Sequence, residues 1–461
     1  MKETKQVSKH AIVTVLLIGT FIAILNQTIM TTALPHLMED LYITENTAQW
    51  LTTGFMLVNG IMIPVTAFLI QKYTTRTLFF TAMILFTAGT FICALSVNFF
   101  TLLVGRIVQA SCAGIMMPLM QTVLFTLYPV EKRGRAMGVF GLVVAFAPAI
   151  GPTLSGWIID NFDWRVLFQL LLPVSVFILI AGYFLLKNVT ERTSPVLDVL
   201  SVMLSTIGFG GLLLGFSMAG SNGWGSYQVI FPLLIAVVGL YWFIQRQLKQ
   251  EQAMLEFRVF KYKMFSLSLI LVIIVFITFI GGMTILPIYM QKMMGYTAFE
   301  SGLVLMPGGI VLGVLSPITG RIYDKVGSKW LAFTGLSLVT FSAFLLTDIS
   351  AQTTFIYLMI VHAVAMVGNA MVKMPLTTAA LNALPEELIP HGTAMNNTMR
   401  QVAGALGTAV LVTIMTNSEQ DTTVYGVAGA VHGVSVAFIV VTCIGIGGMF
   451  LSLFIEGNRS K

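Results

Sequence analysis

The positions of the basic residues constrain the fold of this chain more than any other feature. Long apolar segments follow one another along the sequence, and 20 of the 25 Lys and Arg residues fall into alternate gaps between them. Only Arg165 and Lys292 fall into the other gaps. Apolar runs of about 17–25 residues cross a bilayer as helices, and basic residues stay on the cytoplasmic side. The pattern therefore predicts a multi-pass membrane protein with both termini in the cytoplasm.

Counting the apolar segments predicts an all-α fold with fourteen transmembrane helices. The expected ranges are 11–34, 46–70, 77–97, 101–126, 136–158, 166–187, 198–219, 228–246, 264–290, 300–320, 329–348, 352–383, 391–416 and 428–455. One gap departs from the charge pattern, because the 384–390 loop should be cytoplasmic but holds Glu386 and Glu387 with no Lys or Arg. The topology is therefore least constrained at this loop.

Composition excludes several classes of function. Charged residues are 10% of the chain and hydrophobic residues 57%, and no gap is long enough to fold as a soluble catalytic or nucleic-acid-binding domain. The net charge of +6 is explained by the placement of basic residues on one side of the membrane. There is no phosphate-binding Gly-x-x-x-x-Gly-Lys-Ser/Thr loop, no catalytic cluster and no metal-ligand spacing. We therefore expect no enzyme activity, no cofactor and no metal.

A ten-residue pattern that occurs twice divides the chain. Residues 320–329 (GRIYDKVGSK) form one copy, and residues 67–76 (AFLIQKYTTR) form a degenerate one. The correspondence predicts two six-helix halves, 11–187 and 264–455, with two extra helices in 198–246 between them. Secondary transporters place their substrate site between such repeats.

The better-preserved copy is a candidate conformational motif. Its key residues are Gly320, Asp324, Gly327 and Lys329. Asp324 can accept hydrogen bonds from an adjacent helix N-terminus or pair with a neighbouring basic residue, and so hold one conformation. The alternative is an ordinary basic loop that anchors two helices. The first copy has Gln71 in place of the aspartate, so any such latch should be weaker there.

The segment 136–158 contains a second candidate motif. It holds Pro148, Gly151, Pro152 and Gly156, which free carbonyl groups and allow close helix approach. We expect this face to line the boundary between the two halves.

Several motifs together resemble one family. They are Thr28–Pro35 (TIMTTALP), Trp50–Leu57 (WLTTGFML), Gly105–Gln109 (GRIVQ), Gly151–Gly156 (GPTLSG), Trp164-Arg165, Asp198, Leu286–Gln291 (LPIYMQ), Gly302 to Pro307 and Arg400-Gln401. The chain resembles the fourteen-helix drug:proton antiporters of the major facilitator superfamily, the EmrB/QacA type, nearly from end to end. The resemblance implies alternating access and proton-driven export of drugs.

One departure from the family pattern concerns proton coupling. The family carries an aspartate two residues before the threonine of the first-helix motif, and here that position is Asn26. An amide does not titrate near neutral pH. The helix boundaries place Asn26 about 10 Å and Arg106 about 8 Å below the outer face, at ~1.5 Å per residue. We therefore expect the two to meet through a carbonyl oxygen of Asn26.

Other ionisable groups must then be weighed as proton carriers. Arg106 lies in an apolar segment, where a charge is costly and usually functional, so we expect a role in gating or proton coupling. Structural hydrogen bonding is the alternative. Glu39, Asp40 and Glu300 lie at outer helix ends, where each is either a solvated boundary charge or a group that folds inward to meet Arg106. His362 titrates near neutral pH, although a lone membrane histidine is more often a packing residue.

Polar residues on predicted inner faces mark a candidate substrate cavity. They are Asn26, Gln27, Thr31, Asn59, Gln109, Gln121, Asn369, Asn396 and Arg400. Arg400 either lines the cavity or pairs with nearby carbonyl and amide groups. Lys373 is expected to extend toward the cytoplasm, and a role in the cavity is the alternative. With 27 Met and 33 Phe residues, the cavity suits assorted amphipathic ligands, although Met and Phe also face lipid.

The leading functional hypothesis is a monomeric, proton-driven exporter of small amphipathic drugs in a bacterial plasma membrane. An exporter of one endogenous lipid, siderophore or wall precursor is the alternative within the class. A receptor or scaffold that has lost transport is the alternative outside it, because Asn26 replaces the titratable group. Protons and the lipid bilayer are expected partners, and nucleic acid is not.

Overall fold

The computed structural model describes the main chain of residues 2–189 and 196–456, without the side chains of residues 2–8, 31, 32, 45, 221, 422 and 423. The long helices in these ranges are α1 (Lys2–Asp40), α2 (Glu45–Lys72), α3 (Thr75–Ala94), α4 (Phe99–Leu127), α5 (Val130–Asn161), α6 (Val166–Leu185), α7 (Val199–Asn222), α8 (Tyr227–Lys249), α9 (Lys263–Ile288), α10 (Ala298–Val326), α11 (Lys329–Leu345), α12 (Phe355–Asn382), α13 (Ile389–Asn417) and α15 (Val427–Ser452). Short helical elements are η1 (Phe257–Lys261), η2 (Tyr289–Met293), η3 (Glu386–Leu388) and α14 (Thr422–Tyr425).

Every expected apolar segment forms a helix. In the described part of the chain, 13 helices are long and apolar enough to cross a membrane, while α11 is apolar but shorter. Many boundaries differ from the predicted ones by a few residues. For example, α5 begins at Val130 and α10 continues to Val326, so most of the motif in 320–329 is helical. The first helix continues through Pro35 to Asp40, where Leu37 is fully buried. The helix expected from residue 352 begins at Phe355, because the hydroxyl of Thr354 accepts a hydrogen bond from the Tyr357 amide and caps it.

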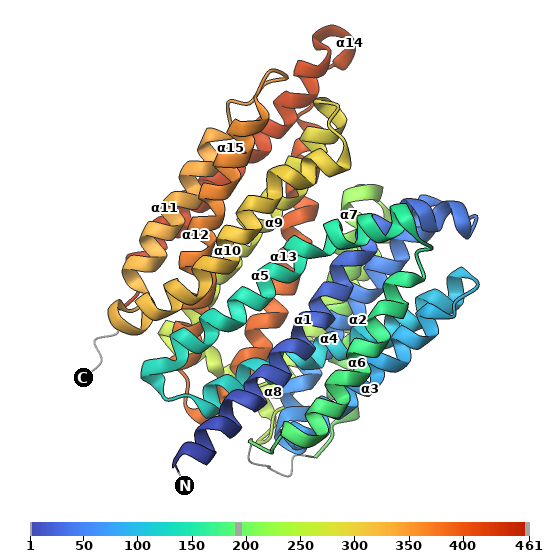
Figure 1. The fold of residues 1–461 in the computed structure, drawn as a ribbon. Coiled ribbons are helices and arrows are strands. Elements are labelled where there is room, and N and C mark those ends of the chain that lie inside the picture. The colour runs from blue at the N-terminus through green and yellow to red at the C-terminus, as the bar shows by residue number, and fades with distance from the viewer. Residues whose placement is uncertain (1, 190–195, 457–461) are drawn as a thin grey trace.

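The helices form two groups that meet along a seam. One group contains α1–α6, and the other contains α9–α13 and α15. Figure 1 shows α5 and α10 running side by side along the seam. Elsewhere along the seam α2 packs against α13, and α7 packs against both of these helices. The indole of Trp224, just after α7, donates to Thr413 of α13 at 2.9 Å.

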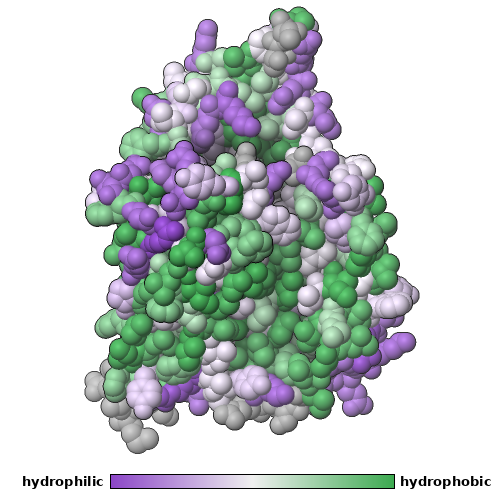
Figure 2. Space-filling view, turned by 90° about the vertical axis from the view of Figure 1, so that its right-hand side faces the viewer, coloured by the Kyte–Doolittle hydropathy of each residue, from purple (hydrophilic) through white to green (hydrophobic). Residues whose placement is uncertain are grey.

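The two ends of the bundle differ in charge. We call the end that holds the α2–α3, α4–α5, α8–α9 and α10–α11 loops the basic end, because most of the basic residues lie there. Figure 2 shows hydrophobic residues as a broad belt on the visible face, with hydrophilic residues gathered above and below it. Large apolar side chains such as Phe177, Phe184 and Phe231 are exposed on helices that enclose the bundle. Such a belt suits the hydrocarbon core of a bilayer.

Candidate functional site: buried polar groups along the seam

Arg106 is fully buried at the centre of a polar cluster in the first helix group. Its Nη1 donates to the main-chain carbonyl of Asn26 at 3.1 Å and to Oε1 of Gln109 at 3.2 Å. Its guanidinium also lies 4.3 Å from the centroid of the Phe55 ring. The predicted meeting of Asn26 and Arg106 is therefore present, and it runs through the main chain of Asn26.

The amide of Asn26 occupies the position where the resembling family has a carboxylate. Its Nδ2 donates to Oε1 of Gln109 at 3.0 Å, and Nε2 of Gln109 donates to the Thr90 hydroxyl at 2.8 Å. Oδ1 of Asn26 and Nη2 of Arg106 are buried without a hydrogen-bond partner. Because buried polar groups are usually paired, these two atoms are exceptions in an otherwise hydrogen-bonded cluster.

The three outer carboxylates lie elsewhere in this conformation. Asp40 accepts from the Trp164 indole at 2.9 Å and pairs with Arg165 at 3.2 Å. The Trp164 hydrogen bond in particular holds the pKa of Asp40 below its usual value. Glu300 completes a capping box with Thr297 at the start of α10. Neither carboxylate contacts Arg106.

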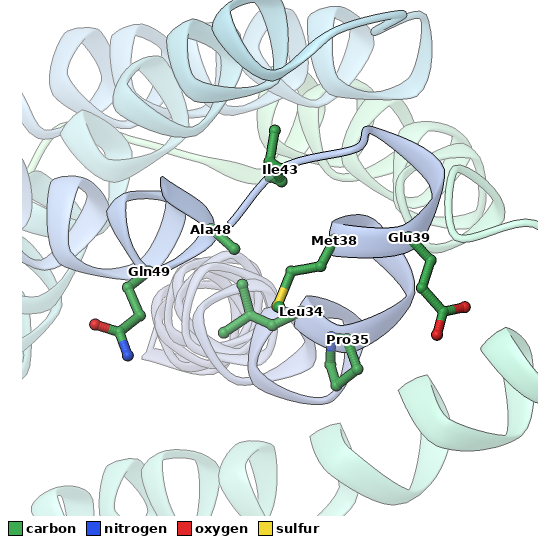
Figure 3. Close-up of a pocket in the computed structure, with 7 residues that line it drawn as sticks. All are labelled: Leu34, Pro35, Met38, Glu39, Ile43, Ala48 and Gln49. Atoms are coloured by element: carbon green, nitrogen blue, oxygen red, sulfur yellow. The ribbon is translucent and has the colours of Figure 1, made fainter. Parts of the chain in front are cut away.

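Glu39 lines a pocket at the end opposite the basic end. The pocket has a volume of about 620 Å³, and its lining comes from the last turns of α1 and the first turns of α2. Figure 3 shows the Glu39 and Gln49 side chains at opposite edges of it. Glu39 is exposed, and in the described part of the chain its carboxylate has no ion-pair partner.

Asp324 joins the two helix groups at the basic end. Its two carboxylate oxygens accept from the main-chain amides of Gly134 at 2.8 Å and Arg135 at 2.9 Å, near the N-terminus of α5. Of the two predicted alternatives, acceptance from main-chain amides of an adjacent helix is therefore correct, in the second turn of α5 rather than at its cap. In the described residues, neither Arg321 nor Lys325 forms an ion pair with Asp324. A Cβ on Gly320 would lie 2.2 Å from the carbonyl oxygen of Gly134, so only glycine permits this approach.

The remaining motif residues shape the same turn. Gly327 ends α10 with φ of +82°, a conformation that favours glycine, and its amide donates to the Tyr323 carbonyl at 2.8 Å. Lys329 is the first residue of α11. These two residues set the turn itself, whereas Asp324 makes the contact across the seam.

The first-half copy makes a different contact. The side chain of Gln71 meets Nε2 of His391 in the first turn of α13, and Nδ1 of His391 accepts from the Glu256 amide at 3.2 Å. The copy therefore also reaches the start of a helix in the other group, but through a neutral pair. Sequence reasoning missed His391.

The unusual acidic loop before α13 also has a partner across the seam. Arg133 of α5 donates to Asn382 at 3.1 Å and lies 3.8 Å from the Glu386 carboxylate. Glu386 thus offsets a charge from the other helix group.

The two glycines of the α5 motif do not line the seam as expected, although Ala149, next to Pro148, meets the position of Gly309 on α10 there. Gly151 packs against Thr28 of α1, and the Ser155 hydroxyl donates to the Ile29 carbonyl at 2.9 Å, so these contacts stay within one helix group. A Cβ on Gly156 would meet no neighbouring atom within 4 Å, and Pro148 and Pro152 lie inside the same helix. The seam instead uses Gly134, Gly138 and Gly141, whose spacing of four and three residues was the available sequence signal.

Some of the candidate cavity residues make a hydrogen bond across the seam, and others have buried amide atoms without a partner. Gln121 and Asn397 meet across the seam, where Nδ2 of Asn397 donates to Oε1 of Gln121 at 2.7 Å. Asn396 is fully buried with both amide atoms unpartnered, and Oδ1 of Asn369 and Oδ1 of Asn59 are also unpartnered. Gln27 is half-buried on α1, and the side chain of Thr31 lies outside the described residues.

Lys373 does not extend toward the basic end. Its Nζ lies 3.1 Å from the centroid of the Phe279 ring, deep in α9. Lys373 is about 14 Å from the end of α12, whereas Phe279 is about 24 Å from the start of α9, at ~1.5 Å per residue. The side chain therefore points away from the basic end, and the expectation of snorkelling was wrong.

Two other ionisable candidates are buried. His362 packs against Gly308 of α10, and its Nε2 has no hydrogen-bond partner. Arg400 lies 4.9 Å from the centroid of the Phe276 ring, and only 9% of the residue is exposed. In the described residues, no group of three or more His, Cys, Asp or Glu side chains could hold a metal ion.

Two helix groups joined along a polar seam within an apolar belt define a multi-pass membrane transport protein. The Major Facilitator Superfamily model matches residues 16–408. The chain belongs to this superfamily, whose members are transporters of small molecules and not enzymes.

Named relatives and solved structures agree with this assignment. The chain is 51% identical over 455 residues to the uncharacterized MFS-type transporter YcnB of Bacillus subtilis strain 168, covering 98% of this chain and 96% of that one. It is 44% identical to the lincomycin resistance protein LmrB of the same organism, covering 91% and 88%. The crystal structure of human MFSD10 (TETRAN), an organic anion transporter, aligns with a TM-score of 0.71 at 14% identity, covering 96% and 99%, which shows the fold alone.

Proposed function

We propose that this chain is a multidrug exporter of the fourteen-helix drug:proton antiporter group, which moves small amphipathic molecules by alternating access. The observation that carries this proposal is the contact between the two helix groups at the basic end. There Asp324 accepts from the Gly134 amide, and Gly320 approaches the same residue closely, so the breaking of a few contacts would let one group move against the other. The relationship to a lincomycin resistance protein supports drugs as substrates.

The proposal assigns an orientation and a division of the chain. Residues 11–187 and 264–455 form the two six-helix halves, and the helices in 198–246 are the additional pair beside the seam. We count α11 as a crossing helix, which brings the total to fourteen. The basic end, with both termini, faces the cytoplasm of a bacterium, and the protein works as a monomer.

Dye efflux with and without a proton uncoupler tests this function. Cells that lack their major exporters would be loaded separately with ethidium, a cation, and with fluorescein, an anion, with or without expression of the chain. Export of either dye counts as export of an amphipathic molecule, and lincomycin susceptibility would be measured in parallel. We expect expression to lower dye accumulation and to raise lincomycin tolerance, and the uncoupler to abolish the dye effect. If accumulation of a broad panel of dyes and drugs is the same as in cells with the empty vector, the chain does not export drugs.

We further propose that an outer carboxylate carries the proton in place of Asn26. Arg106 has an unpartnered Nη2 in this conformation, and a nearby arginine lowers the pKa of a carboxylate. Contact with Arg106 in one state and its loss in the other would supply the alternation that antiport needs. Glu39 is about 20 Å from Asn26 along α1, at ~1.5 Å per residue, so the contact requires movement of the last turns of α1.

The combined substitution Glu39→Gln, Asp40→Asn and Glu300→Gln is therefore expected to stop uncoupler-sensitive efflux while substrate binding stays measurable. The matched control replaces Asp160, Asp348 and Glu419, which lie in loops or helix ends on the same side of the bundle, with their amides. Both proteins would be compared for dye efflux and for dye binding after purification. If the first variant still concentrates substrate against its gradient, the outer-carboxylate proposal fails and His362 becomes the next candidate.

A further inference from the structure

Two cations inside the second helix group have no acidic partner. Lys373 lies in α12 and Arg400 in α13, both within segments long and apolar enough to cross a membrane. The ion pairs in the described part of the chain all involve Arg133, Arg165, Arg246 or Arg258. A buried charge without a counter-ion is costly, so its retention calls for an explanation.

The two cations are neighbours because they share one aromatic ring. Nζ of Lys373 lies 5.5 Å and Cζ of Arg400 lies 4.9 Å from the centroid of Phe276, on α9. Phe279, one turn further along α9, lies under Lys373. Cation–π contacts offset part of the desolvation cost but neutralise no charge. Two like charges in a medium of low dielectric constant repel each other, and an anion between them would relieve that repulsion.

Unpaired amide groups lie on the same helix faces. Asn396 precedes Arg400 by one helical turn, and both its Nδ2 and its Oδ1 are buried without a partner. Asn369 precedes Lys373 by one turn, and its Oδ1 is likewise unpartnered. Nδ2 of Asn396 is a free donor for an anionic oxygen. Each of the two cations therefore lies one helical turn from an asparagine with an unpartnered amide atom.

The cluster also lies beside the seam. Asn397 contacts Gln121 of α4, and Nε2 of Gln401 donates to the Met56 carbonyl of α2 at 3.5 Å. Met374, next to Lys373, packs against the position of Gly141 on α5. A molecule bound at Lys373 and Arg400 would consequently lie where movement of one half against the other can expose it.

We infer that Lys373 and Arg400 form a binding site for the anionic group of an amphipathic molecule, a carboxylate, sulfonate or phosphate, with Phe276 and Phe279 against its apolar body. The inference rests on the proposed function, in that the ligand is a transported amphipath. Arg400 presents a planar fork that suits such oxygens, and Lys373 supplies a point charge. The site that selects the charge of the substrate thus lies in the second half. It is separate from Arg106, which lies in the first half.

Dyes that share a xanthene skeleton but differ in charge test this inference. Fluorescein is anionic and rhodamine 6G is cationic, and the binding of each to the purified full-length protein would be followed by fluorescence anisotropy in a neutral detergent. We expect the wild-type protein to bind fluorescein at least tenfold more tightly than rhodamine 6G. Lys373→Met and Arg400→Gln should each weaken fluorescein binding about tenfold and leave rhodamine 6G binding unchanged or tighter.

Controls separate charge recognition from loss of structure. Lys373→Arg and Arg400→Lys keep the charge and should retain most fluorescein binding, and Lys292→Met removes an exposed lysine and should have no effect. Short-chain phosphatidylglycerol and phosphatidylcholine would be added as competitors. If phosphatidylglycerol displaces fluorescein and phosphatidylcholine does not, the anion site is supported and its ligand is a lipid head group. If neither lipid displaces fluorescein, the site is supported and its ligand is a small amphipathic anion.

Two results would overturn the inference. One is a wild-type protein that binds both dyes equally. The other is a pair of neutral variants that lose both dyes together, or neither. Binding is measured without transport, so the two proposals can fail separately. A protein that exports drugs but shows no preference for anions would contradict this inference and still support the proposed function.

Discussion

Arg106→Ala is expected to abolish active efflux while the protein remains inserted in the membrane. The guanidinium holds the main chain of α1 at Asn26 and the side chain of Gln109 together, and its removal leaves both acceptors buried with fewer donors. It also removes the charge that any proton-carrying carboxylate would meet. We expect uncoupler-sensitive dye efflux to fall to the level of the empty vector.

The conservative variant tests whether charge at this site matters. Arg106→Lys keeps the positive charge but has fewer donors than the guanidinium, so partial efflux should survive. Membrane insertion and thermal stability of both variants would be measured alongside transport. Wild-type efflux by Arg106→Ala would show that the arginine only fills space.

Asp324→Asn is expected to reduce efflux roughly tenfold, and more than Gln71→Ala does. The Asp324 carboxylate accepts two hydrogen bonds near the N-terminus of α5, where a negative charge is favoured, and hydrogen bonds to charged groups contribute about 1.5–3 kcal/mol each. An asparagine offers one acceptor oxygen and no charge. Gln71 makes only a neutral contact with His391.

The comparison needs equal expression and a neighbouring control. Arg321→Gln changes an exposed residue of α10 three positions before Asp324, and it should leave efflux within about twofold of wild type, as surface changes usually do. Initial rates of dye efflux would be measured for all three variants. Equal losses in Asp324→Asn and Gln71→Ala would contradict a latch that is stronger in the second half.

Sequence reasoning predicted one contact between polar residues, that of Asn26 with Arg106, but not most of the others. Depth along each helix follows from counting residues, which is why the meeting of Asn26 and Arg106 was predictable. The partner of Asp324 was narrowed to two alternatives, and the tertiary structure chose the α5 amides. The direction of Lys373 was predicted wrongly, because its ammonium group lies against two aromatic rings on α9 that the sequence of α12 alone does not reveal.

The sequence by itself determined which segments become helices and how the charges divide between the two ends. Both follow from local physics, since a bilayer requires each crossing segment to be apolar and internally hydrogen-bonded. The tertiary structure alone decided which face of each helix meets which neighbour. Gly151 packs within one half, whereas Gly134 and Gly320 join the two halves. Lys373 and Arg400 converge on Phe276. These choices depend on the close fit of helices far apart in the sequence, which the apolar pattern of any single helix does not encode.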